Sequence, residues 1–249
     1  MVYNEFKIKF KFILEFKATV GGNMANIGHQ EKYQKTRSHI LRHAMLLFLK
    51  HGYTATKITD IAASAGVDKN SVYYIFKDKE TVISELVAYV LEAQLDFTKA
   101  LLKGRTEDKM LIYAVETTLQ LYTAESSEHI REMYNVSYSL PKTSDVIYQT
   151  VSEKLEDIFG AHLPWLESKD FFELEIATGG IMRGLISVPC DRYFTMERKV
   201  KRFIETVFLI YRVPDEKISE TLNFVNSFDY PVLVKQFMEY LPDYLSSKL

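Results

Sequence analysis

Apolar residues recur at the three- and four-residue spacing of helices from residue 32 onward, and this pattern constrains the fold more than any other feature. In the segment 32–50 one helical face carries Ile40, Leu41, Ala44, Leu47 and Phe48. The same spacing predicts helices over 57–65, 69–75, 78–103, 107–124, 127–138, 143–159, 168–187 and 194–211, and two more after Pro214. We therefore expect an all-α fold.

Composition narrows the class of protein. The chain of 249 residues is 47% apolar and 26% charged, which is typical of globular proteins. It contains no uninterrupted apolar run of about 18 residues, so we predict neither a membrane-spanning helix nor a membrane partner. The single cysteine, Cys190, excludes an internal disulfide and suits a reducing compartment. We expect a cytoplasmic protein.

The first 23 residues differ from the rest. They alternate apolar and charged residues, as in a β-strand, yet the chain offers this segment no partner strand. Gly21, Gly22 and Asn23, just before Met24, match the translated image of a ribosome-binding sequence. We interpret residues 1–23 as a leader, mis-annotated or disordered, and expect the natural start at Met24.

Residues 57–76 are predicted to form a helix-turn-helix, because two short helices are joined there by a turn at Gly66. Glycine suits that turn, which requires a residue that tolerates positive φ. Thr56 is the expected cap of the first helix and Asp68 of the second. With Val72 directed inward, the second helix presents its polar residues largely elsewhere, namely Lys69, Asn70, Ser71, Tyr73 and Tyr74.

A longer pattern surrounds this motif: Arg37-x-x-Ile40-Leu41-x-x-Ala44-x-x-Leu47-Phe48-x-x-x-Gly52-Tyr53, Thr56, Asp60-Ile61-Ala62-x-x-Ala65-Gly66-Val67 and Ser71-Val72-Tyr73-Tyr74-x-Phe76-Lys77-x-Lys79-Glu80. It resembles the DNA-binding domain of the tetracycline-repressor (TetR) family of transcriptional regulators. Asp68, Asn70 and Ile75 stand where that family commonly has serine, glycine and histidine. Asp68 caps a helix as well as serine does, and we expect the other two to alter operator preference.

The resemblance implies a DNA-binding domain over 34–94 and a helical effector-binding and dimerisation domain over 95–249, with extra helices at 215–249. The start of a helix in the major groove faces base edges, so Lys69, Asn70 and Ser71 are the candidates there. Lys69 can donate to guanine or to a phosphate, and Ser71 can contact a base edge or the DNA backbone. Asn70 suits adenine. The candidate contacts to the DNA backbone are Lys57, Thr59, Tyr73, Tyr74 and Lys79, the two tyrosines by resemblance.

The charge distribution agrees with a polyanionic partner for the first part of the chain only. Residues 30–80 hold nine Lys and Arg against five Asp and Glu, a net charge of +4. Residues 81–249 hold 18 against 26, a net charge of −8. A basic segment joined to an acidic remainder indicates that the basic segment meets double-stranded DNA.

Three glycines, Gly179, Gly180 and Gly184, lie inside one predicted helix, where each costs about 1 kcal/mol relative to alanine. Close approach of another helix is the best reason for them, so we expect 168–187 and 194–211 to form a homodimer interface. The effector pocket is expected to be mainly apolar and to take a hydrophobic small molecule. Its candidates are Met110, Tyr113, Tyr122, Met133, Tyr134, Tyr138, Trp165, Phe172 and Met182.

The sequence thus predicts a DNA-binding regulator, a repressor that leaves a palindromic operator when a small molecule binds. It carries no nucleophile elbow, catalytic carboxylate pair or dinucleotide fingerprint, so we predict neither enzyme activity nor a cofactor. His39 and His43 have the spacing of metal ligands but are better interpreted as a surface pair. Two alternatives stay open: an activator, and a helical enzyme or protein-interaction module whose helix-turn-helix is only architectural.

Overall fold

A computed structural model describes residues 24–248, so the predictions made for residues 1–23 lie outside the described residues. The chain divides into two units, Met1–Ser38 and His39–Leu249. In the first unit, the described residues belong to helix α2 (Met24–His51), where Thr36 and Ser38 hydroxyls donate to backbone carbonyls one turn earlier. The rest of α2 belongs to the second unit, which contains all the other described helices.

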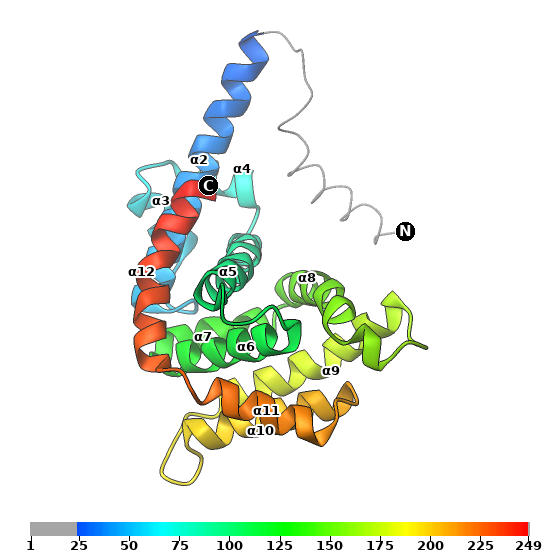
Figure 1. Cartoon of the computed structure of the whole chain (residues 1–249). Coiled ribbons are helices and arrows are strands. Elements are labelled where there is room, and N and C mark those ends of the chain that lie inside the picture. The colour runs from blue at the N-terminus through cyan, green and yellow to red at the C-terminus, as the bar shows by residue number, and fades with distance from the viewer. Residues whose placement is uncertain (1–23, 249) are drawn as a thin grey trace. The chain divides into compact units, whose positions relative to one another are not determined.

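The described residues confirm the predicted all-α class, since they form helices and contain no strand (Figure 1). Residues 39–86, called the head below, comprise the second part of α2, α3 (Ile58–Ser64), α4 (Lys69–Phe76) and the start of α5 (Lys79–Leu102). Their core consists of completely buried side chains on the inner faces of these helices, among them Ile40, Phe48, Ile61, Val72 and Phe76. The head is thus a small bundle closed around one apolar centre.

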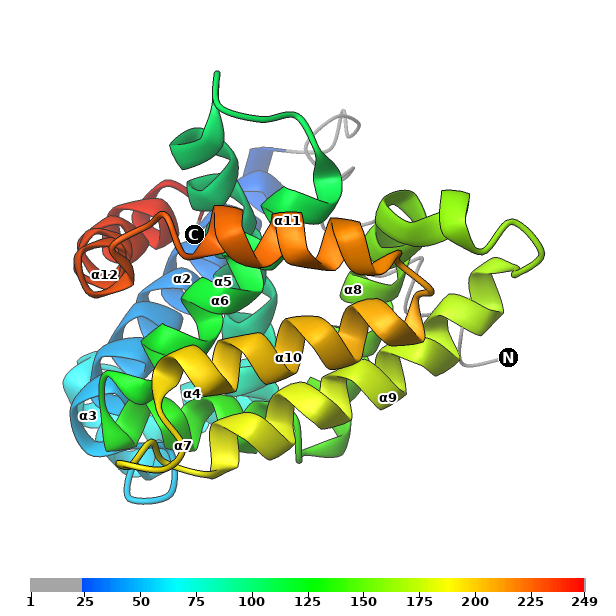
Figure 2. The ribbon, with the colours of Figure 1, turned by 60° about the horizontal axis from the view of Figure 1, so that its bottom comes forward.

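The remaining residues, 87–248, are called the body. After the second part of α5 its helices are α6 (Lys109–Glu125), α7 (Glu128–Ser137), α8 (Pro141–Phe159), the 3-10 turn η1 (Gly160–His162), α9 (Ser168–Ser187), α10 (Met196–Ile210), α11 (Asp215–Val225) and α12 (Tyr230–Lys248). Helix α6 is buried along most of its length and contacts α5, α7, α8, α9, α10, α11 and α12. Helices α9 and α10 lie side by side, and α11 packs on α10 and α6 (Figure 2).

The extra helices after Pro214 close the body around α6. Tyr230, at the start of α12, stacks on Tyr122 of α6 with ring centroids 4.8 Å apart. Farther along α12, Phe237 packs edge-on against Phe97 of α5 at 5.6 Å. Helix α12 thereby packs on both α5 and α6 of the same chain.

Turn chemistry explains several helix boundaries. Gly52, Gly66 and Gly104 all adopt positive φ, at +80°, +61° and +77°, as a left-handed turn requires. Asp68 caps α4 by accepting from the Asn70 amide at 2.7 Å, as predicted. The predicted cap by Thr56 is wrong, because its hydroxyl donates instead to the Gly52 carbonyl at 2.7 Å.

Candidate DNA-binding surface and effector cavity

Helix α4 divides into a buried and an exposed face. Val72 and Phe76 are completely buried in the head core. Tyr73 and Tyr74 point the other way, and their exposed fractions are 43% and 81%. Lys69 and Asn70 are also exposed, and the Lys69 ammonium lies 5.4 Å from the centre of the Tyr73 ring. The exposed face therefore combines a cation, an amide and two phenols, all of which can bind DNA.

The other candidates for DNA contact have different surroundings. Lys57 and Thr59 are exposed at the start of α3, which packs directly on α4. Ser71 is half-buried. Lys79 is held within the protein: its Nζ donates to the carbonyls of Tyr53 at 2.8 Å and Thr56 at 2.9 Å.

The ammonium of Lys79 also lies 4.1 Å from the centre of the Tyr53 ring, and burial lowers the pKa of Lys79. Two of its three N–H donors are used inside the head, so one at most is left for a phosphate. The sequence indicated a lysine in the first turn of a helix but not this internal role. The pattern could not show it, because the acceptors are backbone carbonyls 23 and 26 residues away.

The two histidines on α2 contact α3. His39 Nε2 lies 3.0 Å from the Ala65 carbonyl, and His43 Nδ1 lies 2.8 Å from the Ser64 hydroxyl. Among the residues that the structure describes, no three His, Cys, Asp or Glu side chains are grouped in a way that could hold a metal. Both histidines therefore link α2 to the end of α3.

Among the described residues, Glu132 and Lys142 of the body form polar contacts with the head. The Thr54 amide, after α2, donates to Glu132 Oε1 of α7 at 2.8 Å. Lys142, at the start of α8, reaches Asp78 Oδ2 at 2.6 Å, and its amide donates to Glu80 Oε1 at 2.8 Å. Helices α7 and α8 therefore hold the two flanks of the helix-turn-helix.

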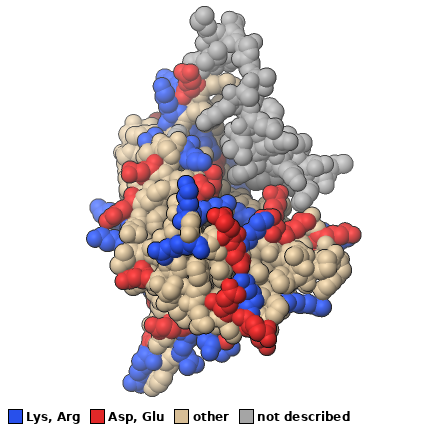
Figure 3. All heavy atoms as spheres, viewed as in Figure 1, with Lys and Arg blue, Asp and Glu red and all other residues tan. Residues whose placement is uncertain are grey.

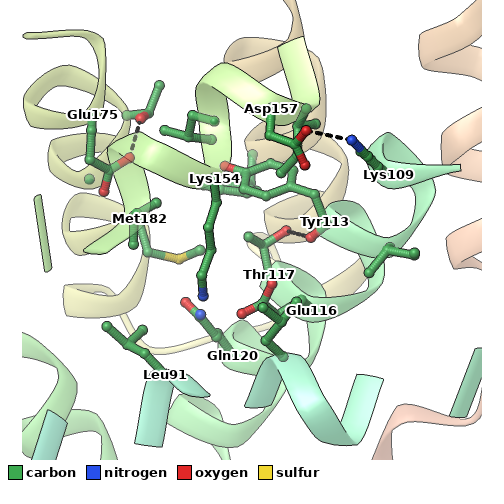
Figure 4. Close-up of a pocket in the computed structure, with 18 of the residues that line it drawn as sticks. Leu91, Lys109, Tyr113, Glu116, Thr117, Gln120, Lys154, Asp157, Glu175 and Met182 are labelled. Carbon is green, nitrogen blue, oxygen red and sulfur yellow. Dashed lines mark hydrogen bonds and ion pairs between the residues drawn. The ribbon is translucent and has the colours of Figure 1, made fainter. Parts of the chain in front are cut away.

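The body contains a cavity of about 170 Å³ between α5, α6, α8, α9 and the end of α7 (Figure 4). A cavity of about 150 Å³ can hold benzene, so this one accommodates a single-ring molecule. Of the predicted effector residues, Tyr113, Tyr138 and Met182 line it. A smaller space of about 60 Å³ lies next to it and is lined by Met133 and Tyr134, together with Phe237 of α12.

The other predicted effector residues, Met110, Tyr122, Trp165 and Phe172, line neither space. Tyr122 stacks on Tyr230, and Phe172 packs edge-on against Tyr148. Trp165 is 58% exposed and carries the Arg212 guanidinium 5.0 Å from its ring. Aromatic composition did not separate cavity from core, because both are built from the same residue types.

Charged residues in the cavity were missed by the sequence analysis. Glu116 of α6 and Glu175 of α9 are both buried there, and Lys154 of α8 extends into the space (Figure 4). Burial raises the pKa of Glu116, and it raises the pKa of Glu175 to about 8. A signal was present, since Glu175 precedes Met182 by seven residues and so shares its apolar helical face.

The three glycines of α9 have different surroundings. Gly179 is buried, and a Cβ there would lie 3.2–3.4 Å from atoms of Glu175, Tyr148 and Tyr138. The close approach at Gly179 is therefore to side chains of its own chain, and its role in a dimer interface stays a prediction. Gly180 and Gly184 are exposed, and a Cβ at either would meet no atom within 4 Å.

Charge on the surface is mixed. On the face drawn in Figure 3, basic and acidic side chains are interspersed among the described atoms. None of the described helices is both long enough and apolar enough to cross a membrane.

Comparisons with known proteins agree with this geometry. Residues 40–86 match the model of bacterial regulatory proteins of the tetR family. The chain is 40% identical over 57 residues to the HTH-type transcriptional regulator AcrR of Shigella flexneri, covering 23% of this chain and 26% of AcrR. It is 36% identical over 62 residues to the transposon Tn10 TetC protein of Escherichia coli, covering 24% of this chain and 32% of TetC.

The likeness to these curated relatives therefore spans about a quarter to a third of their length. A solved structure of RolR with resorcinol has the same fold over more of the chain, with a TM-score of 0.60 and 14% identity. That match covers 79% of this chain and 95% of RolR. Residues 40–86 therefore carry the likeness of this chain to the tetR family of bacterial regulatory proteins.

Proposed function

We propose that this protein is a transcriptional regulator that binds a specific DNA operator with the exposed face of α4 and releases it when a small molecule enters the body. The observation that carries the proposal is the division of α4. Val72 and Phe76 are fully committed to the head core, while Lys69, Asn70, Tyr73 and Tyr74 are left exposed on the opposite face. The family match over residues 40–86 supports a DNA groove as the partner of that face.

The roles of individual residues follow from their exposure. Asn70 and Lys69, at the start of α4, read base edges, and Ser71 approaches the same groove. Tyr73, Tyr74, Lys57 and Thr59 hold phosphates. Lys79 mainly fixes the α2–α3 loop and offers one remaining donor to the backbone. These contacts position a helix in the major groove.

Dimerisation supplies the second half of the operator contact. The face of α9 that carries Gly180 and Gly184 also exposes Ile176, and α10 beside it exposes Leu209. Pairing of these faces in two copies buries apolar side chains that are otherwise in water. Two recognition helices then meet successive major grooves about 34–36 Å apart on a palindromic operator.

Release by an effector uses helices that touch both parts. Helix α5 begins in the head and lines the cavity with Leu91 and Leu95. Helices α7 and α8 contribute Tyr138, which immediately follows α7, and Lys154 to the cavity, and they hold the head through Glu132 and Lys142. A coupling of about 1–3 kcal/mol between the two sites changes operator affinity 5–150-fold, roughly. Repression in the cytoplasm, rather than activation, is the simplest outcome.

In vitro selection of bound duplexes from a random pool tests the function directly. We expect enrichment of one palindromic sequence, and gel shifts in which Asn70→Ala loses discrimination at one base pair of each half-site. Enrichment of no sequence over several rounds would contradict the proposal and favour a protein whose helix-turn-helix is only architectural.

A further inference from the structure

Glu175 is a buried carboxyl group with an incomplete set of partners. It lies on α9 with an exposed fraction of 3%. The Thr178 hydroxyl donates to its Oε2 at 2.9 Å. No described residue donates to Oε1, and no described Lys, Arg or His side chain forms an ion pair with Glu175. The described part of the protein therefore supplies no counter-ion for Glu175. A buried carboxylate without a cation is costly, so a cationic ligand would be stabilised here.

Phenol rings surround this carboxyl from every neighbouring helix. Tyr113 of α6 and Tyr138 at the end of α7 line the cavity with it. Tyr148 of α8 and Glu175 both lie next to Gly179. The hydroxyl of Tyr211, which follows α10, lies 3.5 Å from Oγ1 of Thr178. Burial raises the pKa of Tyr113 and Tyr138, so both stay neutral at physiological pH. A carboxyl among neutral aromatic rings is suited to a cation, which is attracted to both.

The positive charges of the cavity lie away from Glu175. Lys154 extends toward Gln120 and Glu116, at the other end of the space (Figure 4). Lys154 and Lys99 both lower the pKa of Glu116, which burial raises. At the rim, Lys109 pairs with Asp157 at 2.5 Å. Each basic side chain is thus paired, solvated or directed to Glu116, and Glu175 is left for a ligand.

We propose that the cavity binds a small organic cation, an amine on a body of about one ring, with Glu175 as its counter-ion and Tyr113 and Tyr138 as its walls. This inference rests on the proposed function in one respect: the cation is the effector only if the protein is a ligand-responsive regulator. The volume of about 170 Å³ limits the body to roughly one ring. Gly179 has no side chain, and a Cβ at this position would lie 3.2 Å from Glu175 Oε1. The glycine therefore leaves space beside Oε1 for the ammonium group.

Protonation of Glu175 gives this binding a pH signature. Burial raises its pKa to about 8, so the empty site is mostly neutral at pH 7, and a bound cation displaces the proton. The groups facing it are Tyr113, Tyr138, Tyr148 and Tyr211, with Glu116 and Lys154 at the far end. Cation affinity therefore rises with pH up to about 8 and then levels off. A neutral ligand that accepts a hydrogen bond from the protonated carboxyl shows the opposite trend.

Calorimetric titration of the full chain with benzylamine and with benzyl alcohol, its neutral counterpart of matched size, tests the inference. At pH 8 we expect benzylamine to bind more tightly than the alcohol. At pH 7 its binding should release protons, seen as heats that depend on the buffer. Glu175→Gln should weaken benzylamine by about tenfold or more, because a charged hydrogen bond is lost. Glu173→Gln, an exposed neighbour on α9 with the same change of charge, should not.

Urea unfolding of each variant shows whether it is folded. Equal or tighter binding of benzyl alcohol, no binding of either compound at millimolar concentration, or an unchanged affinity in folded Glu175→Gln would overturn the inference. Gel shifts on the same samples without either compound separate it from the proposed function. DNA binding without amine binding overturns the cation site alone, and amine binding without DNA binding overturns the regulator alone.

Discussion

The head and the body use polar residues in opposite ways. In the head, polar side chains such as Asn70 and Tyr74 are exposed, and the apolar residues between them hold the helices together. In the body, polar side chains such as Glu116, Glu175 and Lys199 are buried among apolar ones. The exposed polar groups of the head can therefore bind a large partner at the surface. The buried polar groups of the body can bind only a small molecule that enters the cavity.

A buried charge in the body should be essential for stability. Lys199 is 1% exposed, and its Nζ donates to Glu125 Oε2 at 2.8 Å and to the Val188 carbonyl at 2.7 Å. Lys199→Ala removes two charged hydrogen bonds, each of about 1.5–3 kcal/mol, although Glu125 keeps Arg131 at 3.0 Å. We therefore expect the free energy of unfolding to fall by about 3–5 kcal/mol. Urea denaturation measures this. The control is Lys201→Ala, an exposed lysine 3.8 Å from Glu205, for which a loss below about 1 kcal/mol is expected. Equal losses would contradict the contrast.

The buried carboxyl of Glu175 should make the body less stable as pH rises. Its folded pKa of about 8 lies above the ordinary value of 4.5, so between these pH values the folded state keeps a proton that the unfolded state has lost. Stability therefore falls with pH across this window. Glu175→Gln should match the wild type near pH 5 and exceed it at pH 9 by a few kcal/mol, at about 1.4 kcal/mol per pKa unit. Parallel stability curves for the two proteins would refute this.

In the head, base readers and phosphate contacts should separate. Asn70→Ala should cost about 1–3 kcal/mol on the selected operator and almost nothing on random duplex. Lys57→Ala should weaken both duplexes alike and reduce the slope of log affinity against log salt by about one. Fluorescence anisotropy on both duplexes gives these values. If Asn70→Ala weakened both duplexes equally, Asn70 would not read a base.

The smallest effect is expected where head and body meet. Lys142 pairs with Asp78 at 2.6 Å, but about half of each side chain is exposed to water. Lys142→Ala should therefore lower the free energy of unfolding by about 0.2–1 kcal/mol, and added salt should reduce the difference. The lowered pKa of Asp78 means that this contribution is lost in acid. A loss as large as that of Lys199→Ala would show that the Lys142–Asp78 ion pair holds the fold together, rather than being a weak contact that can break when head and body move.

The same contrast explains what the sequence could predict. Helical periodicity predicted the described α-helices, because most of them bury one face, and it separated Val72 from Tyr73 and Tyr74 on α4. It could not find the use of Lys79 within the head, whose acceptors are distant in sequence. In the body, cavity residues and core residues share one apolar face, so Tyr113 and Tyr122 looked alike. Only the packing of α5 to α9 distinguishes them.

The most direct test of the account is the affinity of the full chain for its selected duplex and for a shuffled duplex of the same composition. Anisotropy titrations between about 50 and 200 mM salt should show a steep loss of affinity on both, which is the sign of phosphate contacts. The selected duplex should stay about 10³-fold tighter or more. Equal affinity for the two duplexes at every salt concentration would contradict the claim that the exposed face of α4 reads DNA.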